Sequence, residues 1–231
     1  MLTVALVCAA GCNKTDGPNN GGDGNEVEIN YVDGPYVDFG LESGTLWGTC
    51  NLGATSPEGY GHYFAWGETS EKDRYDWNHY KYANNSDRGL TKYCSLESHG
   101  YNGFTDTLTT LLPEDDAATA YGDDTWCMPT YAQWEELKNS TTATRTTLNG
   151  VNGMAFTRNG KSIFLPAGGK CWADYIQEKG VAGYYWSSTL NSGWPKEAMF
   201  FYVFEETHST YHFDRANGYT IRPVRSAKFH E

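Results

Sequence analysis

One segment of the chain, WCMPTYAQWEEL at residues 126–137, carries a sharp helix-start signal, and the rest of the sequence has nothing comparable. Thr130 and Gln133 are spaced as a capping box. In this motif the threonine hydroxyl accepts a hydrogen bond from the backbone N–H of Gln133, and the glutamine side chain bonds back to the N–H of Thr130. The segment predicts a helix of about two to three turns that begins near Tyr131. Trp134 is expected to anchor a core, so we interpret this helix as part of the scaffold.

Outside this helix the sequence is typical of short strands, turns and long loops. Aromatic residues make up 15% of the chain, 26 residues are glycine, and helical periodicity is scarce. A short helix is expected after Pro113, where acidic residues suit the helix dipole. Residues 69–105 have no clear period and predict an irregular or functional segment. Strand-like runs are expected at residues 36–54, 59–68, 150–169, 183–190, 197–204, 209–214 and 218–224. Together these elements predict an α+β domain.

The first twelve residues, MLTVALVCAAGC, resemble the end of a bacterial secretion signal. Their apolar run is too short to span a bilayer, and small residues precede Cys12 as in a lipoprotein cleavage box. We interpret residues 1–11 as a signal peptide and Cys12 as the lipid-modified residue. No Lys or Arg precedes the apolar run, which a true start upstream would explain. Residues 12–32 are rich in Gly, Asn and Asp and predict a flexible tether, with an ordinary disordered N-terminus as the alternative.

Charge and cysteine spacing exclude some classes of function. The formal net charge of -12 argues against binding to a nucleic-acid backbone. The cysteines Cys50, Cys94, Cys127 and Cys171 remain for the domain, and no two of them are spaced as CxxC, so a zinc ribbon or a close redox pair is not expected. In an exported protein these cysteines can form zero, one or two disulfides, and the sequence does not choose between these outcomes.

Several segments together resemble one protein family. They are YVDFGLESGTLWGTCNLGATSPEGYGHYFAWGET, LPEDDAATAYGDDTWCMPTYAQWEEL, NGKSIFLPAGG, GYYWSSTL and GYTIRPV. They look like the Fibrobacter succinogenes major paralogous domain, which is abundant in exported proteins of Bacteroidetes-type bacteria. That family is related to the formylglycine-generating-enzyme-like branch of the C-type-lectin fold. The resemblance implies an α+β domain over residues 33–226, with two short helices and a twisted, mainly antiparallel sheet, followed by a tail at 227–231.

The resemblance also raises a catalytic alternative. Formylglycine-generating enzymes use a pair of nearby cysteines toward the C-terminus, whereas the last cysteine here is Cys171. The family usually has Arg where this chain has Cys127, which implies that an arginine contact is missing or that a disulfide replaces it. Because the expected pair of thiols is absent, the sequence predicts a protein that is not an enzyme.

Two groups of residues are candidate metal ligands. His208 and His212 are four apart, but on a strand that spacing separates them by about 13 Å, too far to share one ion. Carboxylates around the short helix are candidate calcium ligands: Glu114, Asp115, Asp116, Asp123 and Asp124. A capped helix with solvated acidic residues is the simpler interpretation of that cluster. No cofactor is therefore predicted, and calcium stays a weak candidate.

The remaining hypothesis is ligand binding through residues 190–219, which mix rigid aromatic and small polar side chains as adaptable binding surfaces do. One face of the strand at 197–204 is expected to be core and the other exposed. The candidate binding residues are Asn191, Trp194, Tyr202, Phe204, His208, Tyr211, His212, Asp214 and Asn217.

The family resemblance adds expectations about location, variation and partners. It implies a lipid anchor at the outer membrane surface and an extracellular protein or glycan as the ligand, in an adhesion or recognition role. Some proteins of this fold are targets of diversity-generating retroelements, which mutate codons in the segment that corresponds to residues 190–219, so a diversified binding face is a further hypothesis. A structural subunit of a pilus or surface layer is the third alternative after binding and catalysis.

Overall fold

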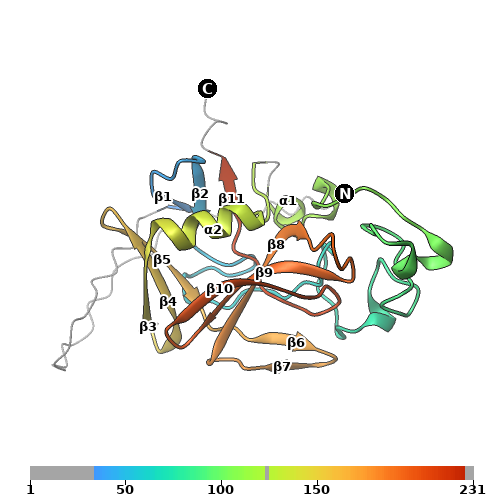
Figure 1. Cartoon of the computed structure of the whole chain (residues 1–231). Helices are drawn as coiled ribbons and strands as arrows, with labels where there is room; N and C mark the ends of the chain where they lie inside the picture. The colour runs from blue at the N-terminus through green and yellow to red at the C-terminus, as the bar shows by residue number, and fades with distance from the viewer. Residues whose placement is uncertain (1–33, 123–124, 227–231) are drawn as a thin grey trace, which may run out of the picture.

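The computed structural model describes residues 34–122 and 125–226 (Figure 1). The predicted signal peptide, Cys12, the tether and the tail at 227–231 lie outside the described residues. The strands are β1 (Tyr36–Asp38), β2 (Thr45–Gly48), β3 (Thr142–Leu148), β4 (Val151–Arg158), β5 (Lys161–Pro166), β6 (Lys170–Trp172), β7 (Tyr175–Gln177), β8 (Ala182–Leu190), β9 (Glu197–Phe204), β10 (Thr207–Asp214) and β11 (Val224–Ser226). The helices are α1 (Ala117–Tyr121), α2 (Tyr131–Ser140) and the 3-10 helices η1 (Trp77–His79), η2 (Glu97–His99), η3 (Tyr101–Gly103) and η4 (Pro113–Asp115).

The strands form small antiparallel sheets. Their orders are β1-β2-β11, β10-β9-β8, β3-β4-β5 and β6-β7, and every strand pair is antiparallel. The last strand pairs with the second, so the two ends of the described chain meet in one sheet. With few helices beside these sheets, the coarse class is mixed α+β, as the sequence predicts.

Helix α2 begins where the sequence predicts, and both bonds of the capping box form. The backbone N–H of Gln133 donates to Thr130 Oγ1 at 3.2 Å, and the N–H of Thr130 donates to Gln133 Oε1 at 2.8 Å. The helix contacts β8, β9 and β10 (Figure 1). Trp134 is fully buried there, stacked on Phe201 of β9 at 4.5 Å between ring centroids. The prediction that this helix anchors a core is confirmed.

The hairpin of β9 and β10 separates two layers of side chains. Phe201 and Val203 of β9 are fully buried in the cluster that includes Trp134. Phe200 faces the opposite side, where it joins a second cluster built around Trp66 and Trp186. Because successive side chains in a strand point to opposite faces, Tyr202 and Phe204 follow Phe200 to the side that α2 does not cover.

The structure differs from the sequence predictions in four segments. Residues 170–177 form the hairpin of β6 and β7, which the sequence analysis did not predict. Residues 142–148 form β3, although TATRTTL shows no apolar alternation. Residues 59–68 do not form a strand, since only Phe64 makes a bridge, to Tyr219. Residues 218–224 make single bridges before β11 begins at Val224. The short helix after Pro113 is present as η4 followed by α1, and Asp116 caps α1 by accepting from the N–H groups of Ala118 and Thr119.

We expect Trp134→Ala to lower the free energy of unfolding by about 3–5 kcal/mol, because it empties a fully buried site where the indole stacks on Phe201. Urea denaturation followed by circular dichroism measures the change. The matched control is Trp194→Ala, since Trp194 is 47% exposed and should shift the unfolding free energy by less than about 1 kcal/mol. Equal effects of the two substitutions would contradict the anchoring role of α2.

Candidate ligand-binding surface

On the side of the β8-β9-β10 sheet that α2 does not contact, four aromatic side chains are exposed or half-buried, and we call them the outer aromatic face. They are Tyr202, Phe204, Tyr211 and Phe213. The register pairs Tyr211 with Phe200 and Phe213 with Ala198, and directly opposite residues in antiparallel strands point to the same face. Tyr211 is 62% exposed and Phe213 is 49% exposed, whereas Tyr202 and Phe204 are half-buried.

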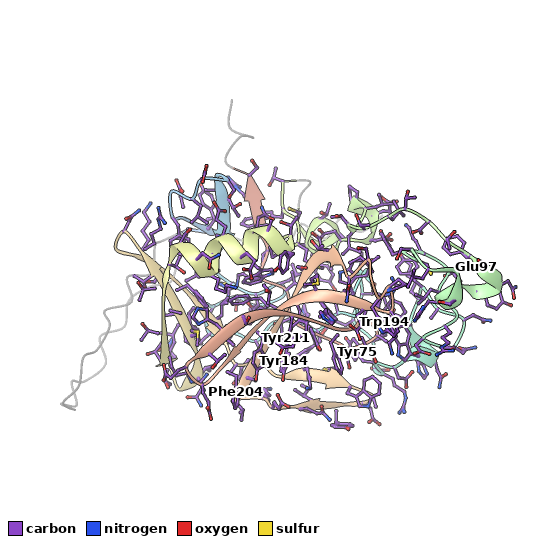
Figure 2. All side chains as sticks on the ribbon, viewed as in Figure 1. Tyr75, Glu97, Tyr184, Trp194, Phe204 and Tyr211 are labelled. Carbon is purple, nitrogen blue, oxygen red and sulfur yellow. The ribbon has the colours of Figure 1, made fainter. Side chains whose placement is uncertain are left out.

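Neighbouring rings hold the outer aromatic face in place. Tyr202 stacks on Phe204 at 6.0 Å between centroids and lies 5.2 Å from Tyr184 of β8. The hydroxyl of Tyr184 donates to Glu178, and Lys170 Nζ lies over its ring at 4.8 Å. Figure 2 shows Tyr184, Phe204 and Tyr211 along this sheet. The exposed ring of Tyr211 lies 6.4 Å from the buried ring of Phe200, which belongs to the same layer.

The two candidate histidines lie on the other side of β10. His208 packs edge-on against Phe156 at 5.5 Å, and burial lowers the pKa of its imidazole, which favours the neutral form. His212 Nδ1 lies 2.5 Å from Glu197 Oε2. Within residues 34–122 and 125–226, no group of three or more His, Cys, Asp or Glu side chains is placed to hold a metal ion.

The other candidate residues are divided between the β8–β9 loop and the end of β10. Asn191 and Trp194 lie in that loop, where the Trp194 ring is 5.1 Å from His99. Asn217 is 2% exposed and its Nδ2 donates to the backbone oxygen of Asp214 at 2.9 Å, so it supports a turn. Burial raises the pKa of the Asp214 carboxyl, although nearby Lys196 opposes that rise.

The structure thus brings three of the candidate residues together, Tyr202, Phe204 and Tyr211, and adds a fourth that the sequence interpretation left out. Phe213 belongs with them because it is two residues beyond Tyr211 on the same strand. The alternation of side chains along β10 could have indicated Phe213, because residues two apart on a strand share a face.

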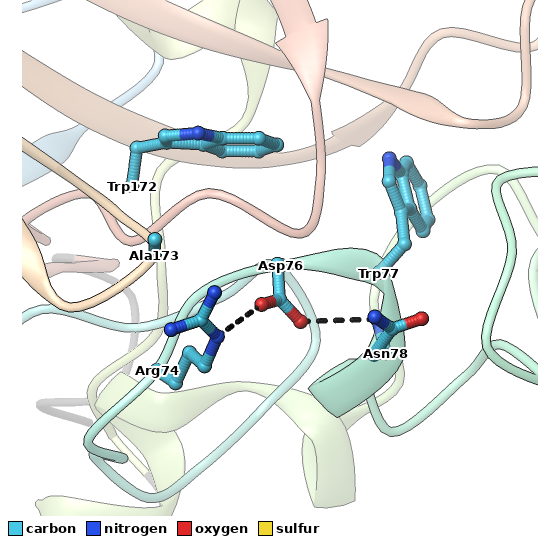
Figure 3. Close-up of a pocket in the computed structure, with 6 residues that line it drawn as sticks. All are labelled: Arg74, Asp76, Trp77, Asn78, Trp172 and Ala173. Carbon is cyan, nitrogen blue, oxygen red and sulfur yellow. Dashed lines mark hydrogen bonds and ion pairs between the residues drawn. The ribbon is translucent and has the colours of Figure 1, made fainter.

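A pocket of about 310 Å³ lies between η1 and the end of β6 (Figure 3). It is lined by Arg74, Asp76, Trp77, Asn78, Trp172 and Ala173. Trp77 forms part of η1, and Trp172 is the last residue of β6. Trp77 packs against the buried cluster that includes Trp186 and Phe200. No sequence pattern indicated this pocket, although aromatic residues are dense in the irregular segment that contains Trp77.

Two acidic residues that were candidate calcium ligands are engaged by protein groups. Asp115 is 2% exposed and accepts hydrogen bonds from Lys92 Nζ at 2.5 Å, Tyr93 Oη at 2.6 Å and the hydroxyl of Tyr82. Burial alone would raise the pKa of the Asp115 carboxyl, but the bonds from Lys92 and the two tyrosines lower it. Asp116 is 4% exposed and caps α1. The candidates Asp123 and Asp124 lie outside the described residues.

The thiols show little sign of activation. Burial raises the pKa of Cys171 to about 11, and burial also raises the pKa of Cys94. A thiol with so high a pKa is almost entirely protonated at neutral pH and is a poor nucleophile. Cys94, Cys127 and Cys171 are free thiols, and Cys50 Sγ lies 3.8 Å from Thr49 Oγ1. Within residues 34–122 and 125–226 Cys127 has no disulfide partner, and its backbone bonds with Val224.

Comparisons with family models, with curated proteins and with solved structures give no match to this chain. The family resemblance drawn from the sequence motifs therefore stays a prediction. In the part of the chain that the structure describes, no helix has the length and apolar character needed to cross a membrane.

We expect Asp115→Asn to lower the free energy of unfolding at pH 7 by about 3 kcal/mol, because it removes the buried charge that Lys92 and two tyrosines stabilise. Because the pKa of the Asp115 carboxyl is lower in the folded than in the unfolded state, its ionised form stabilises the fold above about pH 4. That stabilisation is lost as the pH falls through the folded-state pKa. Between about pH 4 and pH 2 the wild type should therefore lose more stability than the variant.

Urea denaturation at several pH values measures this difference. Asp174→Asn is the matched control, because the Asp174 side chain is 69% exposed and should leave the unfolding free energy almost unchanged. Parallel pH profiles for the wild type and Asp115→Asn would contradict a stabilising role for the buried carboxylate.

Proposed function

We propose that this chain is a lipid-anchored protein of the cell envelope whose C-type-lectin-like domain binds an extracellular protein or glycan through the outer aromatic face. The proposal places the lipid on Cys12 and the domain at the outer membrane surface. The location rests on the signal-like start and the tether, and the fold assignment rests on the sequence motifs. Neither depends on the geometry of the binding surface.

The observation that carries the binding role is the side of the β8-β9-β10 sheet that α2 does not contact, where a buried cluster covers Ala198 and Phe200 but leaves rings of the edge strand β10 exposed. Its other side is closed by α2, but Tyr211 and Phe213 stand mostly in solvent. Rigid aromatic side chains provide large contact area at a low entropic cost, which is why binding surfaces use them. Small polar neighbours, such as Ser209 opposite Tyr202, leave room for a partner between the rings.

Two alternatives have weaker support. An enzyme of the formylglycine-generating kind needs a reactive pair of thiols, and the raised pKa of Cys171 argues against such activation. A structural subunit would assemble through this same face with further copies of the chain. Size-exclusion chromatography without any ligand separates this alternative from recognition, because only the structural subunit would form oligomers on its own.

The direct test is binding by the full chain carrying Cys12→Ser, which removes the predicted lipid. We expect this protein to bind a member of an array of extracellular glycans and secreted proteins. Tyr211→Ala and Phe213→Ala should each weaken that binding by about tenfold or more, since truncated aromatic anchors dominate interface energies. Both residues are exposed, so the unfolding free energy should change little.

The matched control for the binding test is Tyr101→Ala. Tyr101 is a 45% exposed tyrosine of η3 that does not belong to the outer aromatic face. Its removal should leave the affinity within about twofold. Equal weakening by all three variants, or unchanged affinity in both Tyr211→Ala and Phe213→Ala, would assign binding to another surface.

The hypothesis of a diversified face makes a separate prediction about natural variation. We expect deep sequencing of the codons for residues 180–225 in a population of the source organism to show substitutions at the outer aromatic face. Phe201 and Val203 should stay constant, because they are buried against α2. Codons 126–137 serve as the internal control. A segment without variation would leave a receptor of fixed specificity and remove the diversification hypothesis.

A further inference from the structure

We propose that the pocket between Trp77 and Trp172 binds one uncharged pyranose ring of a glycan. The inference rests on the proposed recognition role, because it names the chemical class of one ligand, but it concerns a site separate from the outer aromatic face. None of the pocket residues lies in the segment 190–219 that the sequence singled out.

The two tryptophan rings stand on opposite sides of the pocket, with their planes inclined to each other, as Figure 3 shows. Both indoles are half-buried, so each keeps part of its surface open to a ligand. One face of a pyranose presents carbon-bound hydrogens, whose slight positive charge suits the negative face of an aromatic ring. The hydroxyl groups lie around the edge of the sugar ring and need hydrogen-bonding partners.

Polar groups at the edge of the pocket supply those partners. The Arg74 guanidinium bonds through Nε to Asp76 Oδ2 at 2.6 Å, and its terminal nitrogens remain on the side of the pocket that carries Trp172 (Figure 3). The exposed Asn78 amide makes no side-chain hydrogen bond to the described residues. A sugar hydroxyl can both donate and accept, so it fits a guanidinium and an amide together.

The charges in the pocket favour a neutral ligand. Asp76 accepts from Arg74 Nε and from the backbone N–H groups of Asn78 and His79, and its Oδ1 also lies 2.6 Å from His79 Nδ1. Burial alone would raise the pKa of the Asp76 carboxyl, but the bonds from His79 and Arg74 lower it, so the carboxylate is charged. Arg74 Nη1 also lies 3.8 Å from Asp174. The two carboxylates therefore neutralise the guanidinium, so the pocket has no excess positive charge to attract an anion.

The pocket is held in shape by contacts on both sides. Tyr75 and Ala173 exchange two backbone hydrogen bonds, at 2.7 and 2.8 Å, which fasten the strand of Trp172 to the segment of Trp77. The Trp77 ring also packs edge-on against Tyr80 at 5.5 Å. The volume of about 310 Å³ falls at the small end of ligand pockets, which span about 300–1,000 Å³. It suits a single ring of a glycan rather than a folded partner.

The experiment uses the full chain with Cys12→Ser and four trisaccharide probes. Three are neutral, built from glucose, mannose or N-acetylglucosamine, and the fourth is the charged trimer of galacturonic acid. Calorimetry measures affinity, and saturation-transfer NMR identifies which sugar protons contact the protein. We expect at least one neutral trimer to bind, with the strongest transfer to carbon-bound protons of one ring, and the charged trimer to bind at least about tenfold more weakly.

Variants then place the site. Trp172→Ala and Asn78→Ala should each weaken binding of the neutral trimer, the former by about tenfold or more. Asn78 is exposed, so its replacement keeps the test valid if Trp172→Ala unfolds. The matched control, Tyr101→Ala, removes an exposed aromatic residue of η3 outside the pocket and should leave the affinity within about twofold.

Three results would overturn the inference: no binding of any neutral trimer, tighter binding of the charged trimer, or unchanged affinity in Trp172→Ala and Asn78→Ala. The proposed function fails separately. If Tyr211→Ala still weakens binding to a partner found on the array while the pocket variants do not affect the trimers, only the pocket assignment falls. If the trimers bind as expected but Tyr211→Ala has no effect on any partner, the outer aromatic face loses its role.

Discussion

The fully buried guanidinium of Arg222 is the interaction on which the arrangement of the sheets depends. It donates to the backbone oxygens of Gly48 and Thr49 at the end of β2, to Phe164 O in β5 and to the side chain of Asn51. A buried charge is tolerated only when its hydrogen bonds are made. These bonds therefore fix the β1-β2-β11 sheet relative to the β3-β4-β5 sheet. The chain then passes directly into β11, which closes the first sheet.

Side chains also fix the backbone of residues 69–105 by hydrogen bonds, because this segment has little regular secondary structure. The Asp106 carboxylate accepts from the backbone N–H groups of Tyr93 and Cys94. The fully buried Arg215 donates to the backbone oxygens of the same stretch, at Lys92 and Tyr93. Since buried backbone groups must be paired, these side chains replace the ladder that a strand would provide. An irregular segment can therefore be rigid enough to position Trp77.

Local signals in the sequence predicted α2, the short helix after Pro113 and most strands, because a capping box or a turn acts within a few residues. The acidic residues Asp115 and Asp116 were expected to be solvated, but tertiary contacts bury them. Contacts between elements that are far apart in the sequence could not be predicted in this way. The alternation in β9 gives two sets of residues, and only the position of α2 decides that Phe201 is inside and Tyr202 outside. Strand β3 was missed because its residues are polar, and β4 supplies the pairing. The pocket was missed because Trp77 and Trp172 are joined only through a bridge between distant segments.

The outer aromatic face and the pocket are separate surfaces that rest on one buried cluster of side chains. Trp77 packs against this cluster, which includes Phe200, and Phe200 lies opposite Tyr211 in the β9-β10 hairpin. Leaving Tyr211 and Phe213 in water forgoes the roughly 25 cal/mol per Å² that burial would contribute. A substitution inside the shared cluster would therefore disturb both surfaces, whereas a substitution at an exposed ring changes only its own surface.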